Sequence, residues 1–387
     1  MTNLSTIIAD NNVLTETSTN TVTNKSIDAG QLTGSVAMAR LGSGTADSTT
    51  FLRGDGTFAA AGLNHFTASE STSSPNDTTT VSALTASGTA NNIDLSLVPK
   101  GTGALTRDIP DGSTGGGDKR GNYATDLQGN RSNANRAAKG NYSVVSGGFN
   151  NGAFFQYGTV SGGYNNYTND DYATVVGGRD NSATNNYCIA GGDSSDATGW
   201  NSVALGDNTI ASEQGAVSLG GEYNLADGYY STGIGYSADA KRRPSILCIG
   251  GQNRSSSLST LDHQTAIQCL GGRTTDATPY QLAGYKNTST LYMNGLDSND
   301  HYVFTAYVIG TDYTDTAGWE FKGVVRRVGS ASPTFVGTPS KSSVAATSGA
   351  SAWDADIVAS GNSFTIEVTG EASKTVTWTG SIWTTEV

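Results

Sequence analysis

The sequence is poor in charged residues, cysteine and histidine. Only 14% of its 387 residues are charged, and it has three cysteines and three histidines. An odd, sparse set of cysteines does not make a disulfide scaffold, so Cys188, Cys248 and Cys269 are expected to be thiols without metal-binding spacing. Helix formers are too few for a helical protein. The 50 glycines, 17 tyrosines and many β-branched residues instead predict an all-β, elongated chain.

Long apolar runs and basic clusters are also scarce. No stretch approaches the length that crosses a membrane, and Met1–Ser5 begins no signal-peptide pattern. We therefore expect neither a signal peptide nor membrane insertion. The net charge of -12 would repel phosphates, so no nucleic-acid partner is expected. The one compact basic run, Lys241–Arg243, falls in a turn and is interpreted as a solvated loop.

Groups that could converge on a catalytic centre are few. His65, His263 and His301 are too scattered for a metal cluster or a Ser-His-Asp set. Paired carboxylates, which glycan-cleaving enzymes use, stand at Asp170 and Asp171, at Asp193 and Asp196, and at Asp354 and Asp356. Each pair lies in or beside a predicted turn, where Asp serves the backbone. We therefore expect no enzymatic activity, no catalytic or metal-binding residues and no cofactor.

The sequence does contain a repeat with a period of about 14.6 residues. It is marked by Gly148, Gly163, Gly178, Gly192, Gly206, Gly220, Gly235 and Gly250, at intervals of 15, 15, 14, 14, 14, 15 and 15 residues. Three positions before these glycines stand aliphatic residues and one threonine, and two before stand small ones. The position just before is glycine in the first four repeats and Leu or Ile afterwards. This period of two predicts a strand with one face buried.

Each repeat has room for two short strands and two turns, which is one coil of a narrow parallel β-roll. Asn or Asp after the glycine supplies the positive backbone angle of a tight turn. One coil carries too few large apolar side chains to enclose a core, so a closed homotrimer is expected to cover the remaining apolar face. The predicted trimer or roll core is Val145, Val160, Val175, Ile189, Val203, Leu205, Val217, Leu219, Ile234, Leu247 and Ile249.

The repeat resembles a known family. Asn201–Gly206, Gly215–Gly220 and the intervening Asn208–Ala211 resemble the head repeats of YadA-like trimeric adhesins, and about a third of the chain shares the pattern. The resemblance implies a left-handed parallel β-roll built from three chains. Such rolls are used both in bacterial adhesins and in phage tail fibres.

Both ends of the sequence resemble phage tail-fibre proteins. Leu32–Ala37 and Phe51–Phe58 are similar to a segment that recurs in such fibres, and Pro99–Leu105 is similar to their shafts. Gly318–Gly323 and Ile366–Trp378 resemble the C-terminal knob of tail fibres. The predicted parts are a virion-attachment segment at 1–60, an extended β shaft or linker at 61–120, the β-roll at 121–272 and an antiparallel β-sandwich knob at 273–387.

The tail-fibre resemblance implies a function. It predicts a structural virion protein that attaches by its N-terminus to a phage tail, baseplate or adaptor protein. Its distal region would bind a host cell-surface glycan or outer-membrane protein, and the chain would be made in the host cytoplasm. A YadA-like bacterial surface adhesin is an alternative that the missing secretion pattern disfavours. A polysaccharide-degrading tailspike is another, which the scattered carboxylates disfavour.

Two surface features are candidates for receptor contact. The loop Gly310–Gly318 presents Tyr313 between Asp312 and Asp315, which suits a sugar or a polar protein patch, although an ordinary polar turn also explains it. Aromatics recur six residues before the glycines, at Tyr142, Tyr157, Tyr172, Trp200 and Tyr229, with Tyr187 one position out of register. This ladder could stack sugars, and packing between coils explains it as well.

Overall fold

The computed structural model describes residues 50–52, 58–60, 66–71, 81–86, 92, 96–240, 242–252, 263–284, 301–329, 331–361 and 363–386. Apart from a short 3-10 helix, η3 (Ser348–Ala350), the regular elements in these ranges are β-strands, as the composition predicts. No helix there is long and apolar enough to cross a membrane. The chain divides into two compact units, Met1–Ser96 and Leu97–Val387.

The first unit contains two antiparallel hairpins in its described residues. Strand β1 (Thr50–Leu52) pairs with β2 (Phe58–Ala60), and β3 (Phe66–Ser71) pairs with β4 (Val81–Ala86). Most of the expected attachment segment, residues 1–60, lies outside the described residues, and so does the fibre-like segment Leu32–Ala37.

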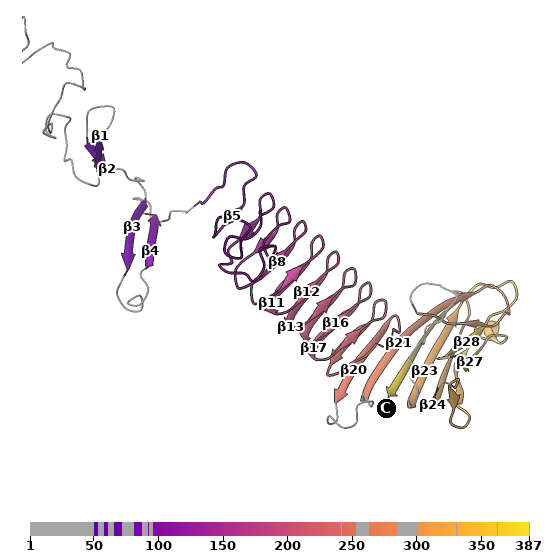
Figure 1. The fold of residues 1–387 in the computed structure, drawn as a ribbon. Coiled ribbons are helices and arrows are strands. Elements are labelled where there is room, and N and C mark those ends of the chain that lie inside the picture. Colours follow the sequence, from indigo (N-terminus) through magenta and orange to yellow (C-terminus); the bar gives the residue numbers. More distant parts are fainter. Residues whose placement is uncertain are drawn as a thin grey trace, which may run out of the picture. The chain divides into compact units, whose positions relative to one another are not determined.

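The second unit begins with a parallel β-solenoid of about eight turns (Figure 1). Each turn adds one strand to a long-strand sheet, and the turns from β7 to β18 also add one to a short-strand sheet. The long-strand sheet contains β5 (Leu105–Thr106), β6 (Thr125–Asp126), β7 (Val144–Val145), β9 (Thr159–Val160), β11 (Thr174–Arg179), β13 (Ile189–Asp193), β15 (Val203–Asp207), β17 (Val217–Glu222), β19 (Thr232–Gly235) and β20 (Ile246–Gln252). The short-strand sheet contains β8 (Gly152–Ala153), β10 (Tyr167–Thr168), β12 (Ser182–Ala183), β14 (Asp196–Ala197), β16 (Ile210–Ala211) and β18 (Leu225–Ala226).

The parallel ladder confirms the predicted coil of two strands and two turns. It starts at β5, which pairs with β6, and so begins before residue 121, where the roll was expected to start. The two residues of β5 therefore belong to the solenoid, although they fall in the stretch expected to form a shaft or linker.

Small side chains fill the space between the two sheets. In the long-strand sheet one inward position per coil is fully buried, at Val145, Val160, Val175, Ala190, Ala204, Ser218 and Cys248. The short-strand sheet buries Ala153, Ala183, Ala197, Ala211 and Ala226. Because alanine and valine bury little apolar area, each coil depends on its neighbours and on hydrogen bonds for stability.

Buried asparagines form one corner of the coil. The Asn166 side-chain amide donates to the carbonyl oxygens of Gly162 and Gly178, each at 2.8 Å, and its Oδ1 accepts from the Asn181 backbone N–H at 2.9 Å. Asn151 and Asn181 repeat these bonds to glycine carbonyls one coil before and one coil after. The ladder satisfies backbone groups that the turns would otherwise leave unpaired.

The turns follow the predicted chemistry. Asn150, Asn165, Asp180 and Asn208 have φ angles of 57°, 56°, 55° and 49°, in the left-handed region that Asn and Asp tolerate. Gly163 has a φ of 93°, and a Cβ at this position would lie 2.1 Å from the carbonyl oxygen of Gly178 in the next coil. Backbone angle and contact between coils both require glycine there.

Beyond β20 the long-strand sheet continues with antiparallel strands into a C-terminal lobe. In spatial order these are β21 (His263–Thr274), β29 (Val376–Glu386), β23 (His301–Thr311) and β24 (Thr316–Arg326), with β25 (Thr334–Phe335) and β26 (Ser340–Ala346) paired to β24. A separate three-stranded sheet contains β22 (Tyr280–Gln281), β28 (Ser363–Thr369) and β27 (Asp354–Ser360). The C-terminal strand β29 thus lies between β21 and β23.

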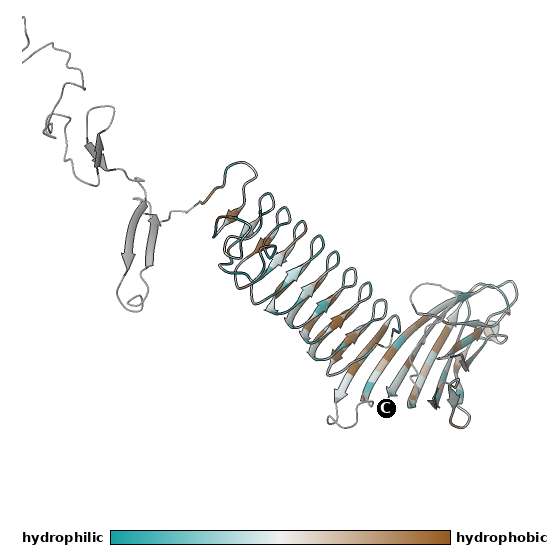
Figure 2. Ribbon diagram, viewed as in Figure 1, coloured by the Kyte–Doolittle hydropathy of each residue, from teal (hydrophilic) through white to brown (hydrophobic). Residues whose placement is uncertain are grey.

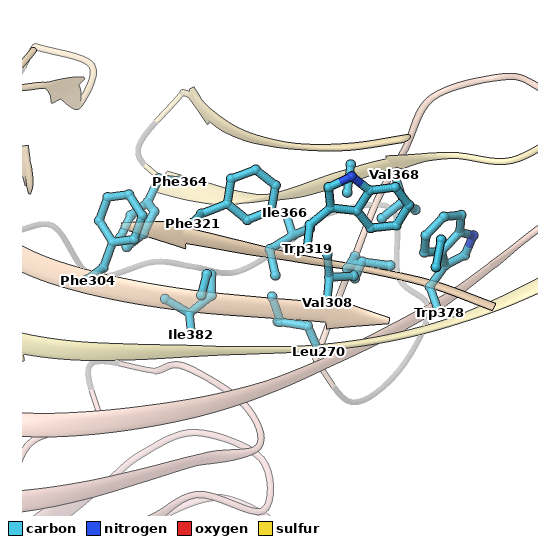
Figure 3. Packing of buried hydrophobic residues seen from close by; sticks show 14 of the residues in the cluster. Leu270, Phe304, Val308, Trp319, Phe321, Phe364, Ile366, Val368, Trp378 and Ile382 are labelled. Atoms are coloured by element: carbon cyan, nitrogen blue, oxygen red, sulfur yellow. The ribbon is translucent and has the colours of Figure 1, made fainter. Parts of the chain in front are cut away.

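The lobe contains the large apolar core that the solenoid lacks (Figure 3). Phe304 and Trp319 of the long sheet are buried with Phe364 and Ile366 of the three-stranded sheet. The long sheet has 16 strands and runs from the solenoid through the lobe without interruption, and brown apolar segments recur along it (Figure 2). Strand β21 crosses the expected boundary at residue 272, so the larger sheet of the lobe belongs to the solenoid as well.

A buried ion pair joins the last coil to the C-terminal strand. Arg243 Nη1 lies 2.6 Å from Glu386 Oε1, and Gln264 and Thr384 donate to the same carboxylate. Burial alone would lower the pKa of Arg243, but the charge of Glu386 outweighs it and raises that pKa. The prediction of a solvated loop at Lys241–Arg243 is therefore wrong for Arg243, whereas Arg242 is exposed.

Candidate functional site

The predicted core residues divide into two groups. Val145, Val160 and Val175 are fully buried inside the solenoid of a single chain. The other eight lie half-buried or exposed on the outer face of the long-strand sheet: Ile189, Val203, Leu205, Val217, Leu219, Ile234, Leu247 and Ile249. We call these eight residues the outer stripe. They are not part of the core of one chain.

A change in strand register explains the division. Val175 pairs with Ala190 rather than with Ile189, and the pairing shifts at a bulge between Val175 and Gly178. From β13 onward the inward position is therefore the small residue two before the glycine. Gly177 has a φ of 131° in this bulge, so its backbone angle already favours glycine.

The tyrosine ladder lies on the outside of the first coils. Tyr123, Tyr142, Tyr157, Tyr172 and Tyr187 stack in one column with ring centroids 4.7 to 5.2 Å apart and planes within 14° of parallel. Tyr187 is in register with the other tyrosines of the column, so the expected shift by one position is wrong. In the next coil the equivalent backbone position is Asn201 and not Trp200. Since neighbouring rings cover one another's faces, packing between coils accounts for the column and leaves ring edges for solvent.

The predicted receptor residues Asp312, Tyr313 and Asp315 form the tight turn between β23 and β24. Tyr313 is 92% exposed and has a φ of 74°. The carboxylate of Asp312 accepts hydrogen bonds from the backbone N–H groups of Asp315 at 2.7 Å and Thr314 at 3.0 Å. These bonds lower the pKa of Asp312. Asp312 therefore supports the turn, and Tyr313 is the side chain it presents to solvent.

Asp315 is held from the other side. Its Oδ1 accepts from the Thr347 hydroxyl at 2.7 Å, and its Oδ2 lies 3.9 Å from Lys374 Nζ. Lys374 also lies 2.9 Å from Glu371 and 5.8 Å from the ring centre of Trp353. The turn thus rests on a small polar cluster at one end of the lobe, which fixes the backbone beneath Tyr313.

The paired carboxylates serve local structure in each case. Asp170 accepts from the backbone of Asp171, and Asp171 accepts from that of Gln156. Asp193 lies in an ion pair with Arg179, which lowers the pKa of Asp193, and Asp196 accepts from Ser182. Asp354 and Asp356 share Lys341 at 2.7 and 2.8 Å. Within the described residues no group of three or more potential metal ligands gathers.

Sequence reasoning missed the buried arginines. Besides Arg243, the first coils bury Arg120, whose Nε lies 2.8 Å from Asp126, and Arg131, whose Nη2 lies 3.7 Å from the same carboxylate. Burial lowers the pKa of Arg131. An arginine followed six residues later by an aspartate is too common a spacing to mark such a site. The partners of each buried arginine can be identified only from the folded coil.

Comparison with known proteins assigns neither a family nor a function to this chain. No family model matches this sequence, and no curated protein matches it. Among solved structures, it is similar to the tailspike protein of Acinetobacter phage vB_ApiP_P1, with 9% identity and a TM-score of 0.15. The match covers 67% of this chain and 58% of the tailspike chain. At this level the similarity carries no argument about function.

Proposed function

We propose that this chain is the subunit of a homotrimeric phage tail fibre that acts by binding and not by catalysis. The N-terminal segment attaches it to the phage tail, baseplate or adaptor protein. The solenoid is a YadA-like roll, and the C-terminal lobe is a sandwich-like knob that contacts a glycan or outer-membrane protein of the host.

The outer stripe is the observation that carries this proposal. Ile234 is 39% and Ile249 47% exposed on a surface that has an aliphatic residue in every coil from β13 to β20. Single exposed apolar residues are ordinary, whereas a contiguous apolar row marks an interface. A homotrimer buries the same row on all three chains, and closed symmetry leaves no copy uncovered.

The lobe supports binding at its exposed turns. The turn at Asp312–Asp315 is held rigidly from beneath and presents one aromatic ring, and recognition commonly lies on loops that a sheet scaffold positions. Three such turns on one particle would raise a weak contact by avidity where receptors are dense. The sequence resemblance to tail-fibre knobs at Gly318–Gly323 points to the same part of the chain.

A competition assay tests the proposal. Purified full-length protein is added to host cells before phage particles that carry the same chain, and adsorption of the particles is measured. We expect the protein to block adsorption, and the variant Leu205→Asp, which puts a charge in the outer stripe, to lose trimers and block much less. Asp207→Ala, two residues further along, is the matched control and should behave like the parent. Failure of the parent protein to compete would contradict the proposal.

A further inference from the structure

From the coils to β24 the long sheet has one covered face and one open face. In the solenoid the short-strand sheet covers the inner face, and in the lobe the three-stranded sheet covers it. On the other face of β20, β29 and β23 several large apolar side chains are exposed: Ile249 47%, Val303 60%, Tyr307 45%, Ile309 50% and Trp383 50%. We call these five residues the outer patch.

Strand register makes the outer patch a continuation of the outer stripe. Leu247 of the stripe lies opposite Ile267, and Ile267 lies opposite Trp383. One row further along, Ile249 lies opposite Thr265, which lies opposite Thr385, which in turn lies opposite Val303. In these rows an uncharged face therefore extends from the coils across β21 and β29 to β23.

The face is almost free of charge. Among the residues of β20, β21, β29 and β23 whose burial is described, those in register with the outer patch are aliphatic, aromatic, Thr, Ser, Gly or Cys, apart from Arg273 and His301 near the strand ends. Charges begin on β24 with Glu320 and Lys322, which pair 3.0 Å apart. Beside Trp383 and Tyr307 the twisted sheet forms a hollow of about 450 Å³, lined also by Thr265, Thr305 and Thr385.

We propose that a second copy of this chain covers the outer patch, so that the subunit contact made by the outer stripe continues over the C-terminal lobe. This inference rests on the proposed homotrimer. A partner lying along both stripe and patch must match the axial repeat of the coils, and a copy of the chain has that repeat. The patch alone exposes apolar area on the order of 500 Å², near the largest patch found on ordinary monomers. The stripe adds to it, approaching the ~800 Å² per partner of stable interfaces.

The proposal also limits where the host can bind. A saccharide could in principle stack on Trp383 or Tyr307, but a copy of the chain seated on this face excludes it. On the lobe, receptor contact is then left to the turn at Asp312–Asp315, to the exposed strand β26 and to the outside of the three-stranded sheet. Two other occupants of the patch, a saccharide or a segment of the same chain, give different outcomes in the test below.

Cys269 provides a native probe for this face. It is exposed in the single chain and pairs in register with Ser381 next to Trp383, whereas Cys188 and Cys248 are buried. We would treat the full-length protein with a maleimide under native conditions and follow labelling by mass spectrometry. Thr314→Cys, in the exposed turn of the lobe, is the reference for a fully accessible thiol. We expect the Cys269 thiol of the assembled protein to react at least tenfold more slowly than the thiol introduced in that variant.

Two variants place a charge within the patch, Trp383→Arg and Val303→Lys. In either variant we expect Cys269 to be labelled as fast as the reference thiol, while the outer stripe keeps the chains together. Val303→Lys is used if Trp383→Arg does not fold. If the protein is a trimer and its Cys269 reacts as fast as the reference thiol, the inference is wrong and the proposed homotrimer still stands. Saccharide binding to the patch would then be measured. Protection that persists in both variants means the chain covers its own patch, which also overturns it. Absence of any trimer would instead refute the proposed function.

Discussion

Glycine, asparagine and tyrosine set the geometry of the first coils. At the turn after the inward strand position, glycine accepts a left-handed backbone and lets the next coil approach to van der Waals distance. Buried asparagines then bond to the glycine carbonyls, and stacked tyrosines fill the opposite turn. Small residues are therefore required by geometry, and the aliphatic ones beside them remain on the outside.

Gly163→Ala tests this geometry. The new methyl group would meet the carbonyl oxygen of Gly178, and the residue would also be held at a φ of 93°. We expect the free energy of unfolding to fall by well over the ~1–2 kcal/mol that left-handed strain alone costs. Gly337→Ala is the control, since its φ is 78° but no atom lies near the new Cβ. Equal midpoints for the two variants in thermal unfolding would show that contact between coils does not matter.

Tyr313 is the residue we expect to contact the receptor. Because its side chain is 92% exposed, Tyr313→Ser should leave the melting temperature unchanged. In the adsorption assay it should compete about tenfold less well, the effect of ~1.4 kcal/mol lost at an aromatic contact. Tyr223→Ser is matched in residue type and has a φ of 60° on the roll, and it should compete normally. Equal competition by both variants would remove the turn from the binding surface.

At the scale of elements, the C-terminal strand holds solenoid and lobe together. β29 lies between β21 and β23, and its Glu386 reaches the last coil through Arg243. Both side chains of this pair are at most 2% exposed. Removing one partner from such a pair leaves a buried charge without compensation, whereas removing both does not.

Single and double variants of this pair test its role. Glu386→Gln should lower the free energy of unfolding by about 3–5 kcal/mol, because Arg243 would stay charged and buried. The double variant Arg243→Met, Glu386→Leu should lose much less. Urea unfolding of the single variants Arg243→Met and Glu386→Leu and of the double variant that combines them gives the coupling energy. Additive losses would mean that the two charges do not interact, contrary to the 2.6 Å contact.

The sequence predicts where the strands and turns lie better than it predicts which face of each strand is buried. The spacing of Gly148 to Gly250 gives the coils, and Asn after glycine gives the turns, because both depend on local backbone angles. The glycine spacing does not tell which side of a strand is covered. One extra residue at the bulge beside Gly178 changes the inward position from the third residue before the glycine, Val175, to the second residue before the next glycine, Ala190. Pairing between distant segments, as between Arg243 and Glu386, leaves no periodic signal. The exposed turn at Tyr313 could be predicted from the sequence, because a turn depends on a few neighbouring residues.

In the whole molecule, one sheet face with an apolar stripe and patch lacks a partner within the single chain. With the outer stripe and the outer patch covered, the lobe still offers a receptor its polar turn, strand β26 and its three-stranded sheet. A single chain in water would expose that whole apolar face, which favours association of copies over a monomeric state.

Sedimentation velocity of the full-length protein at neutral pH tests this requirement most directly. We expect one sharp species with three times the chain mass of 39.8 kDa, unchanged on dilution, and a shift to smaller species for Leu205→Asp but not for Asp207→Ala. A folded, monodisperse monomer of the parent protein would contradict it.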